Sequence, residues 1–218
     1  MKLKTDLVEK LHTLIPGDEI NDPKITKNQR LVITKLGMEG LDDMYDYSKK
    51  SVFYRNLNIE SHKTKKDTEN YLNELIRRTK DGYAGWKAMY WFIRLRSSQK
   101  VIGTFGFMNL DENKKSIQIG KGLSPDYWGK GYVYELLGIM LTYAFITLDL
   151  NYIYSMTQRT NIANIKSMEK SGFKVVKLID DYVDGIGIKN DTVKMIVRKE
   201  EASPIVCFDI AFKKYKTL

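Results

Sequence analysis

The chain has 218 residues and a formal net charge of +9, with 43% hydrophobic and 29% charged residues. This composition excludes a disordered or fibrous chain and fits a single globular domain. The chain has one cysteine and two histidines, too few for a disulfide framework or a zinc site, so we expect no metal. The single cysteine also suits a reducing compartment, so we expect a cytoplasmic location. The longest uncharged apolar stretch, residues 136–148, is shorter than the roughly 20 residues that a bilayer requires, so no membrane partner is expected.

The positive charge favours anionic partners, such as nucleic acids, acidic protein surfaces or phosphorylated cofactors. The Lys and Arg residues are spread along the chain and form no stripe interleaved with aromatic residues. This distribution argues against a nucleic-acid-binding protein. That function is kept as the less favoured alternative, and it predicts an association that weakens steeply with salt.

The first third of the chain reads as helices around one strand. Leucines recur at helical spacing over residues 3–15, which predicts a short helix. Residues 30–36 alternate between apolar and polar side chains, as a half-buried strand does. Residues 39–54 and 66–79 have helical periodicity, so two helices are expected before the sheet continues.

The rest of the chain predicts a sheet interrupted by two helices. Short apolar runs bounded by turn residues predict strands over residues 88–96, 101–110, 116–123, 152–158, 173–180 and 192–197. Residues 131–148 are apolar on more than one face, which predicts a helix buried against that sheet. A second helix is expected over residues 161–171. This order predicts a mixed α/β (α+β) domain rather than a doubly wound fold.

Three parts of the chain are therefore expected. Residues 1–28 form an N-terminal helical extension, residues 29–199 form the main domain, and residues 200–218 form a C-terminal extension. The extension contains an apolar run over residues 205–212, which predicts an added strand. Such a strand would extend a sheet across two subunits of a homodimer.

The segment Leu123–Tyr132, LSPDYWGKGY, has the clearest chemical signal. A strand ends here, a proline and two glycines follow, and the long apolar helix begins. Such a turn presents consecutive backbone N–H groups at a helix N-terminus, which binds anions and phosphates above all. Gly129 and Gly131 would let a ligand approach the backbone, and Lys130 adds positive charge. Glycines that only shape a tight turn explain the spacing equally well, because the P-loop and dinucleotide spacings are absent.

A second segment, RTNIANIKSMEKSGF over residues 159–173, follows a predicted strand and begins the last predicted helix. Asn161 and Asn164 are three residues apart in its first turn. Asn161 is expected to cap the helix. The additional hypothesis is that an Asn amide in this turn also contacts a ligand.

Together the two segments resemble the GNAT superfamily of acetyl-CoA-dependent N-acetyltransferases, over about residues 30–197. Within that superfamily, the chain looks most like the RimJ/RimL branch of ribosomal-protein N-terminal acetyltransferases. The matching residues are Val101-Ile102-Gly103, Ile119-Gly120, Tyr127-Trp128-Gly129-Lys130-Gly131-Tyr132, Glu135, Tyr143-Ala144-Phe145, Asn161 and Glu169-Lys170-Ser171-Gly172-Phe173. Several matches in order at the family's spacing are more specific than either motif alone.

The resemblance implies a GNAT fold, with a central, mostly antiparallel twisted sheet and helices on both faces. The sheet would be splayed at residues 116–123 and 152–158, with the pantetheine arm of acetyl-CoA between these strands. A backbone N–H near Leu123 would polarise the thioester carbonyl. Backbone N–H groups from about Tyr127 to Tyr132 would hold the coenzyme's diphosphate. The cofactor-binding residues implied in this way are Leu123, Tyr127, Trp128, Gly129, Lys130, Gly131, Tyr132, Asn161 and Asn164.

Departures from the family's pattern concern proton transfer. In this branch a Glu often precedes the Ile-Gly pair, and here Gln118 stands there, which cannot act as a base. Lys121 replaces the Tyr that commonly follows the Gly. In many GNAT enzymes a Tyr four residues before the Gly of the Gly-Phe pair donates a proton to the leaving thiolate, and Met168 occupies that position.

The groups that would transfer protons therefore have several candidates. Gln118 could orient a substrate or a water, and Ser167 is a candidate donor although it is rotated by about 100° from the Tyr position. The acid or base could also come from elsewhere, namely from Tyr152, Tyr154, Asp180, Asp181 or Tyr182. Alternatively, positioning and the oxyanion N–H alone could support the reaction.

The resemblance thus implies an acyltransferase in which a primary amine attacks the thioester of acetyl-CoA directly. The acceptor would be a small molecule, such as an aminosugar, an antibiotic or another metabolite, or a protein N-terminus. Because Gln118 and Met168 replace the usual groups, an acyl-CoA-binding module with little turnover is the main alternative.

Overall fold

A computed structural model gives the fold of the chain over residues 30–57, 60–81, 88–183 and 189–202. The helix predicted over residues 3–15 and the strand predicted over residues 205–212 lie outside the described residues. The homodimer that depends on that strand stays a prediction, as do the boundaries drawn for the two extensions.

Within the described residues, seven strands form one mixed sheet. Their bounds are β1 (Leu31–Lys35), β2 (Met89–Leu95), β3 (Val101–Asp111), β4 (Ser116–Leu123), β5 (Tyr152–Gln158), β6 (Lys174–Val183) and β7 (Lys189–Arg198). Their order across the sheet is β1-β2-β3-β4-β5-β7-β6, and only β4 and β5 pair in parallel. The predicted mixed, mostly antiparallel sheet is confirmed.

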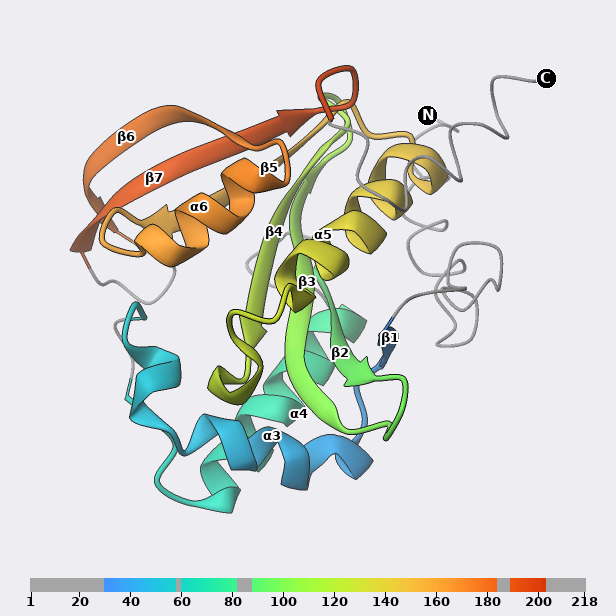
Figure 1. Cartoon of the computed structure of the whole chain (residues 1–218), viewed down its shortest axis with the longest axis vertical. Coiled ribbons are helices and arrows are strands. Elements are labelled where there is room, and N and C mark those ends of the chain that lie inside the picture. The colour runs from blue at the N-terminus through green and yellow to red at the C-terminus, as the bar shows by residue number, and fades with distance from the viewer. Residues whose placement is uncertain (1–29, 58–59, 82–87, 184–188, 203–218) are drawn as a thin grey trace.

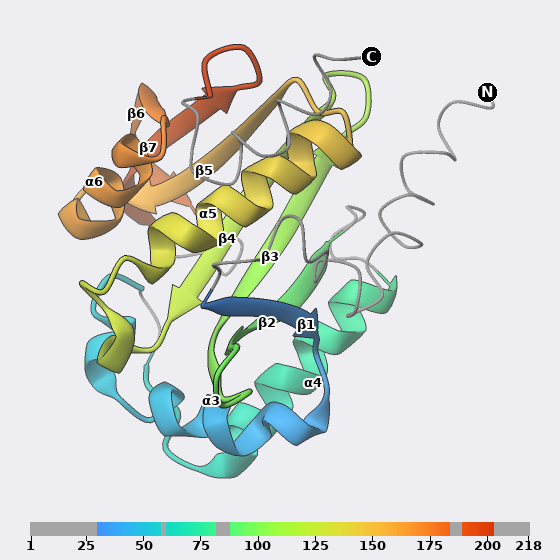
Figure 2. The ribbon, with the colours of Figure 1, turned by 45° about the vertical axis from the view of Figure 1, so that its right-hand side comes forward.

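Helices cover both faces of this sheet (Figures 1 and 2). The α-helices are α3 (Leu41–Ser48), α4 (Lys65–Asp81), α5 (Tyr132–Thr142) and α6 (Ile162–Lys170). Strand alternation explains the two layers, because Trp91 and Ile93 join the core on the α5 and α6 side, whereas Phe92 joins the core with α3 and α4. None of the described helices is long and apolar enough to cross a membrane.

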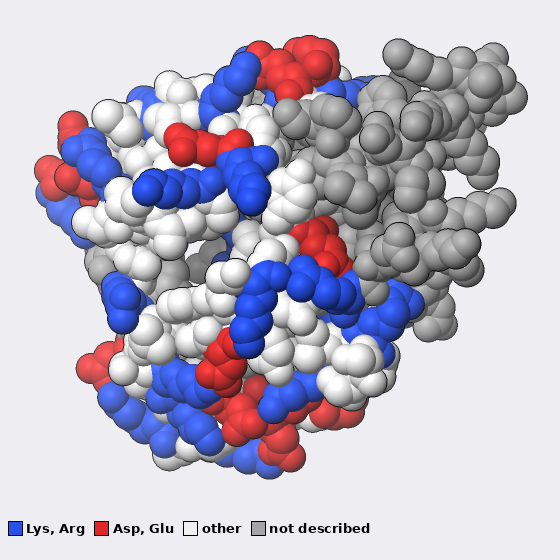
Figure 3. Space-filling model, viewed as in Figure 1, with Lys and Arg blue, Asp and Glu red and all other residues white. Residues whose placement is uncertain are grey.

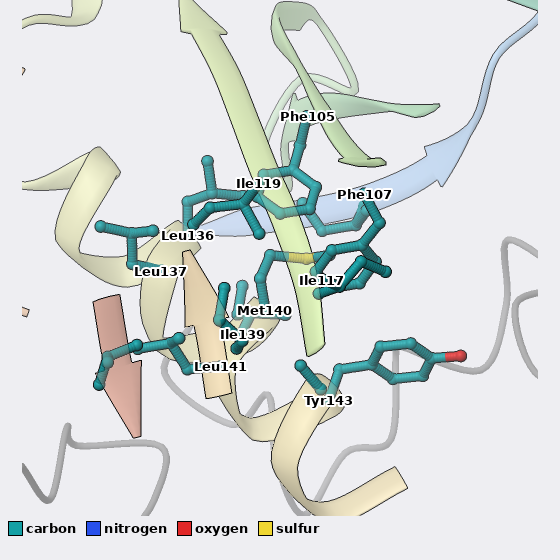
Figure 4. Packing of buried hydrophobic residues seen from close by; sticks show 14 of the residues in the cluster. Phe105, Phe107, Ile117, Ile119, Leu136, Leu137, Ile139, Met140, Leu141 and Tyr143 are labelled. Atoms are coloured by element: carbon teal, nitrogen blue, oxygen red, sulfur yellow. The ribbon is translucent and has the colours of Figure 1, made fainter. Parts of the chain in front are cut away.

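The larger core lies between α5 and the sheet, and Figure 4 shows its side chains. Phe105 and Phe107 of β3 contact each other edge to face, with ring centroids 5.1 Å apart. The α5 residues that pack against β3 and β4 are Leu136, Leu137, Ile139, Met140 and Leu141. Burial of one such leucine contributes about 1.5–3 kcal/mol. The core therefore fixes both ends of the loop that joins β4 to α5.

The helix predicted over residues 39–54 is interrupted. The structure has a 3₁₀ turn at Met38–Gly40, then α3, then a second 3₁₀ turn at Ser51–Tyr54. Lys50 is extended between the last two (φ −85°, ψ 112°). This break brings the Phe53 ring to 5.0 Å from the Tyr47 ring and lets Lys50 form an ion pair with Asp126, which follows β4. Contacts between distant segments thus override the local helical pattern.

The helix predicted over residues 131–148 also ends earlier than expected. α5 stops at Thr142, and Tyr143–Thr147 form one wider π turn, in which the Leu148 N–H donates to the Tyr143 carbonyl at 3.1 Å. Phe145 and Leu148 stay buried through this turn. The wider turn therefore ends the helix without losing its apolar contacts.

The sheet opens between β4 and β5, and Figure 1 shows the two strands diverging. Parallel pairing covers three residue pairs, from Ser116 with Tyr152 to Gln118 with Tyr154. Beyond these pairs β4 runs on to Leu123 with no pairing to β5. The predicted splay is confirmed, and the gap is the stretch beyond Gln118 and Tyr154 where the two strands no longer pair, across which Asn164 of α6 contacts both strands.

Candidate active site

The loop between β4 and α5 presents a row of unpaired backbone N–H groups. The first helical N–H bond of this region is donated by Glu135 to the Gly131 carbonyl, at 3.2 Å. The six N–H groups from Gly129 to Tyr134 have no acceptor among the described residues. They lie at the N-terminus of α5, where the helix dipole adds positive potential. Such a row of donors is able to hold an anion.

The first two loop amides that were assigned to the coenzyme diphosphate are already bonded within the protein. The Tyr127 N–H donates to the Ser124 carbonyl at 2.9 Å, and the Trp128 N–H donates to the Pro125 carbonyl at 3.1 Å. The proline begins a 3₁₀ turn that uses both donors. These two N–H groups are therefore engaged within the loop, and the free row begins at Gly129.

Two glycines give the loop its shape. Gly129 has φ +71° and Gly131 has φ +79°, which are left-handed conformations that favour glycine. A Cβ built on Gly129 would meet no protein atom within 4 Å. The space in front of this backbone is therefore open. The Lys130 ammonium folds back along the loop and donates to the Asp126 carbonyl at 2.8 Å.

Glu135 ties the start of α5 to the start of β1. Its carboxylate accepts hydrogen bonds from the Arg30 N–H at 2.6 Å, the Leu31 N–H at 2.9 Å and Arg30 Nε at 2.9 Å. Arg30 also donates to the Lys130 carbonyl at 2.9 Å and lies 4.1 Å from the centre of the Tyr132 ring. The sequence assigned no role to Arg30, because the residues that it contacts here are about a hundred positions away along the chain.

The free edge of β4 faces the gap. Ser124 donates its N–H to Ile102 of β3 at 2.7 Å, so by strand alternation the N–H groups of Leu123 and Lys121 point to the opposite edge. The Leu123 carbonyl on that edge accepts a hydrogen bond from Trp128 Nε1 at 2.7 Å. Trp128 is thereby anchored, although 43% of it remains exposed. The Leu123 N–H borders the gap, where the resemblance places the thioester.

Asn161 and Asn164 both take part in the structure of α6. The Asn161 side chain accepts a hydrogen bond from the Asn164 N–H at 3.2 Å, so the predicted cap is confirmed. The Asn164 side chain bridges the gap, because its Nδ2 donates to Thr157 of β5 at 3.1 Å and its Oδ1 accepts from Lys121 of β4 at 2.7 Å. Asn164 therefore lies between the two splayed strands.

Replacing Asn161 by alanine is expected to lower the free energy of unfolding by about 1 kcal/mol, because the first turn of α6 loses its side-chain acceptor. Urea unfolding measures the change. Serine at the same position keeps an oxygen acceptor and is expected to retain most of the stability. An equal loss in both variants would contradict a capping role.

Lys121 is a site residue to which the sequence assigned no role. Its ammonium donates to Asn164 Oδ1 at 2.7 Å and lies 3.2 Å from Met168 Sδ. Burial of the charged form lowers the pKa of Lys121 to about 8. The only signal in the sequence was the replacement of a tyrosine common in the family, and the contact with α6 depends on the fold.

Ser167 does not present a free donor to the gap. Its hydroxyl donates to the Asn164 carbonyl in its own helix at 2.8 Å. Met168 is fully buried, with its sulfur against Lys121. The donor role expected of Ser167 finds no support in this geometry, because the hydroxyl proton is bonded to the helix backbone.

Gln118 belongs to a second cluster of polar side chains, on the face of β4 opposite Lys121. Tyr182 interacts electrostatically with Tyr154 of this cluster. Gln118 Oε1 accepts a hydrogen bond from Asn109 Nδ2 at 2.7 Å, and a bulge in β3 with φ +53° at Asn109 allows this contact. Burial raises the pKa of Tyr154, and the electrostatic interaction with Tyr182 raises it further. A hydrogen bond with Asn109 opposes this rise. A cleft of about 270 Å³ on this face is lined by Asn109, Asp111, Lys114, Ser116, Tyr152, Tyr154 and Lys194.

Comparison with known proteins adds the family. Residues 30–174 match the family model described as an acetyltransferase (GNAT) domain. A protein named "uncharacterized N-acetyltransferase p20" from Bacillus licheniformis is 26% identical over 173 residues, which cover 79% of this chain and 95% of that protein. "Uncharacterized N-acetyltransferase YoaA" from Bacillus subtilis (strain 168) is 28% identical over 120 residues, or 55% of this chain and 68% of that protein.

Solved structures share the fold. The spermidine N-acetyltransferase from Vibrio cholerae in complex with CoA and spermine superposes with a TM-score of 0.64 at 17% identity, covering 80% of this chain and 98% of that chain. The microcin C7 self-immunity acetyltransferase MccE, in complex with acetyl-CoA and AMP, gives a TM-score of 0.69 at 15% identity, covering 86% and 99%.

The family match spans more than half of the chain and includes the loop with the free amides, the splayed strands and α6. The narrower likeness to the RimJ/RimL branch stays a prediction. The chain belongs to the GNAT acetyltransferase family and is an N-acetyltransferase.

Proposed function

We propose that this protein transfers the acetyl group of acetyl-CoA to a primary amine, carried by a small molecule such as an aminosugar, an antibiotic or another metabolite, or by a protein N-terminus. The observation that carries the proposal is the row of six N–H groups from Gly129 to Tyr134, for which the described part of the chain offers no acceptor. The row suits a diphosphate, and it lies beside a gap with a free strand edge that suits an amide-containing pantetheine arm. Cytoplasmic location is part of the proposal, in keeping with the single cysteine.

The residues around the gap have separate tasks in this proposal. The loop amides hold the diphosphate, and the free edge of β4 aligns the arm. The Leu123 N–H donates to the thioester oxygen, which favours charge developing on that oxygen. Acetyl-CoA, when bound, supplies an activated acyl group. Asn164 keeps β4 and α6 at a fixed separation through its bonds to Lys121 and Thr157.

The face with Gln118 suits the acceptor amine. Two of its tyrosine rings already lie beneath cations, because Lys194 Nζ is 4.5 Å from the centre of the Tyr154 ring and the Arg198 guanidinium is 5.8 Å from that of Tyr152. The faces of these rings are therefore already occupied by protein cations. Gln118 and Asn109 offer neutral groups that orient the amine without binding its proton. These neutral groups support an amine that binds in its uncharged, reactive form.

Two measurements test the proposed function. Calorimetric titration is expected to show one acetyl-CoA per chain with a micromolar Kd, and absence of binding at high micromolar concentration would reject the proposal. A thiol-release assay with a panel of amines then identifies the acceptor class. The panel contains an aminosugar, an aminoglycoside, spermidine and peptides with Ala or Ser at a free N-terminus.

The main alternative is an acyl-CoA-binding module with little turnover. The observations that favour it are Gln118, which has no basic group, and Met168, which has no proton to donate. Binding of acetyl-CoA without thiol release for any amine of the panel would support this alternative. Release that depends on one amine class would exclude it.

Nucleic-acid binding is the less favoured alternative. Figure 3 shows Lys and Arg interspersed with Asp and Glu on the face with α5 and α6. Lysines also pair with nearby carboxylates, as Lys115 and Lys199 do with Asp149 at 2.8 and 2.7 Å. A basic surface for phosphates would leave such lysines unpaired. A flat dependence of oligonucleotide retention on salt would dispose of this function.

A further inference from the structure

The ammonium group of Lys121 lies between β4 and α6, at the gap where β4 no longer pairs with β5. It is partly buried, and Phe105 of β3 is its partner across the sheet. The α6 groups in contact with its Nζ are Asn164 Oδ1 at 2.7 Å and Met168 Sδ at 3.2 Å. On β5, the Thr157 hydroxyl oxygen accepts a hydrogen bond from Asn164 Nδ2. These contacts fix the position of the ammonium group.

The surroundings of Lys121 contain no compensating anion among the described residues. Every group that contacts its Nζ is neutral, and burial alone accounts for its lowered pKa. Withdrawing a cation from water without a neighbouring anion costs free energy, and the cation is stabilised when a negative charge forms beside it. A thiolate leaving group would supply such a charge.

We propose that Lys121 donates the proton that converts the departing coenzyme A thiolate into a thiol. This inference rests on the proposed function. Met168 has no proton to give, and the hydroxyl of Ser167 is bonded to the backbone of α6. The Lys121 ammonium lies 3.2 Å from Met168 Sδ, so a proton donor in this part of the gap is supplied by β4 instead of α6.

The proposed step is balanced. The acceptor nitrogen forms a bond to the acetyl carbon, the C–S bond breaks, and its electron pair goes to sulfur. Lys121 Nζ transfers one proton to that sulfur and becomes a neutral amine. The acylated nitrogen loses its extra proton to solvent, and Lys121 regains a proton from solvent. The products are the N-acetylated acceptor and coenzyme A with a free thiol.

The acidity of Lys121 suits this task. A pKa of about 8 leaves the ammonium mostly protonated at neutral pH, and it lies near the reference value of about 8.5 for a cysteine thiol. Because an acid must be protonated to act, activity through Lys121 is lost as the pH rises through about 8. His62 has a pKa lowered by burial and Tyr154 has a pKa raised by burial, so neither titrates near that pH.

The first test measures the thiol of bound coenzyme A and needs no acceptor. Ultraviolet absorbance of the thiolate is followed against pH in complexes of the wild-type chain, Lys121→Met, Lys121→Arg and the surface control Lys166→Met. We expect the wild-type chain, Lys121→Arg and Lys166→Met to lower the thiol pKa by about 1 unit, because a cation stabilises the thiolate. Lys121→Met is expected to leave it near the value of free coenzyme A.

The second test is the pH profile of kcat with an amine that supports turnover. Lys121→Met is expected to lower kcat about 10²-fold with little change in the KM for acetyl-CoA, and to lose the fall in rate above pH 8. Lys121→Arg is expected to be as slow, because guanidinium does not give up its proton. Lys166→Met is expected to match the wild-type profile. If Lys121→Met does not fold, Lys121→Gln serves in its place.

The outcomes separate this inference from the proposed function. Coenzyme A that binds with the same thiol pKa in the wild-type chain and Lys121→Met overturns the role of Lys121 alone. So does an alkaline fall in kcat that persists in Lys121→Met. Absence of coenzyme A binding to the wild-type chain would reject the proposed function, and the inference about Lys121 with it.

Discussion

Replacing Gly129 by valine is expected to weaken acetyl-CoA binding strongly while leaving the fold in place. The new side chain would meet no protein atom within 4 Å of its Cβ, so it does not crowd the protein. It would instead stand in front of the free N–H groups and displace the diphosphate from them. The Kd for acetyl-CoA is expected to rise at least about 10²-fold, or roughly 2.8 kcal/mol, in a calorimetric titration.

The control for this variant addresses backbone strain. Gly129 has φ +71°, and a valine there costs about 1–2 kcal/mol of stability whatever the ligand does. Gly172, which ends α6, has φ +90°, so Gly172→Val carries a similar strain outside the loop. We expect Gly172→Val to lower Tm at least as much and to bind acetyl-CoA normally. Equal affinity of Gly129→Val and the wild-type chain would contradict the assignment of the loop.

Replacing Glu135 by alanine is expected to destabilise the protein by about 3 kcal/mol, which exceeds the effect of an ordinary ion pair. Its side chain is only 14% exposed, and its loss leaves the N–H groups of Arg30 and Leu31 without their acceptor. Urea unfolding measures the change. Glutamine at this position keeps one acceptor oxygen and is expected to lose less.

Glu60 offers the matched comparison. Its carboxylate pairs with Lys63 at 3.3 Å, but both side chains are largely exposed, at 85% and 69%. Glu60→Ala is expected to change the free energy of unfolding by less than about 0.5 kcal/mol. If Glu60→Ala and Glu135→Ala destabilise the protein equally, the buried hydrogen bonds of Glu135 do not have the importance given to them here.

The sequence predicted those parts of the fold that depend on local patterns. The bounds of β4 and β5 agree with the apolar runs from Ser116 to Leu123 and from Tyr152 to Gln158, because alternation and flanking turns are local properties. The helix expected across Lys50 is broken because Lys50 pairs with Asp126, which is 76 residues away. No window of the sequence contains that contact.

For the candidate site, too, only the features that depend on local sequence were predictable. The glycines at 129 and 131 identified the loop, because positive φ favours that residue type. Which amides are free was not predictable, since it depends on how the turn after Pro125 closes on itself. The position of Lys121 against Asn164 depends on how α6 packs over the gap, 43 residues along the chain.

Only three residue pairs join β4 to β5, and this short pairing affects the resistance of the protein to aggregation as well as its chemistry. Two unpaired strand edges inside one sheet are templates on which foreign strands can add. An occupant of the gap shields both edges, so saturation with coenzyme also holds the two halves of the sheet together. At a ligand concentration 100-fold above Kd, this linkage adds about 2.7 kcal/mol to the free energy of unfolding. A supply of acyl donor would thus protect the enzyme from aggregation while it works.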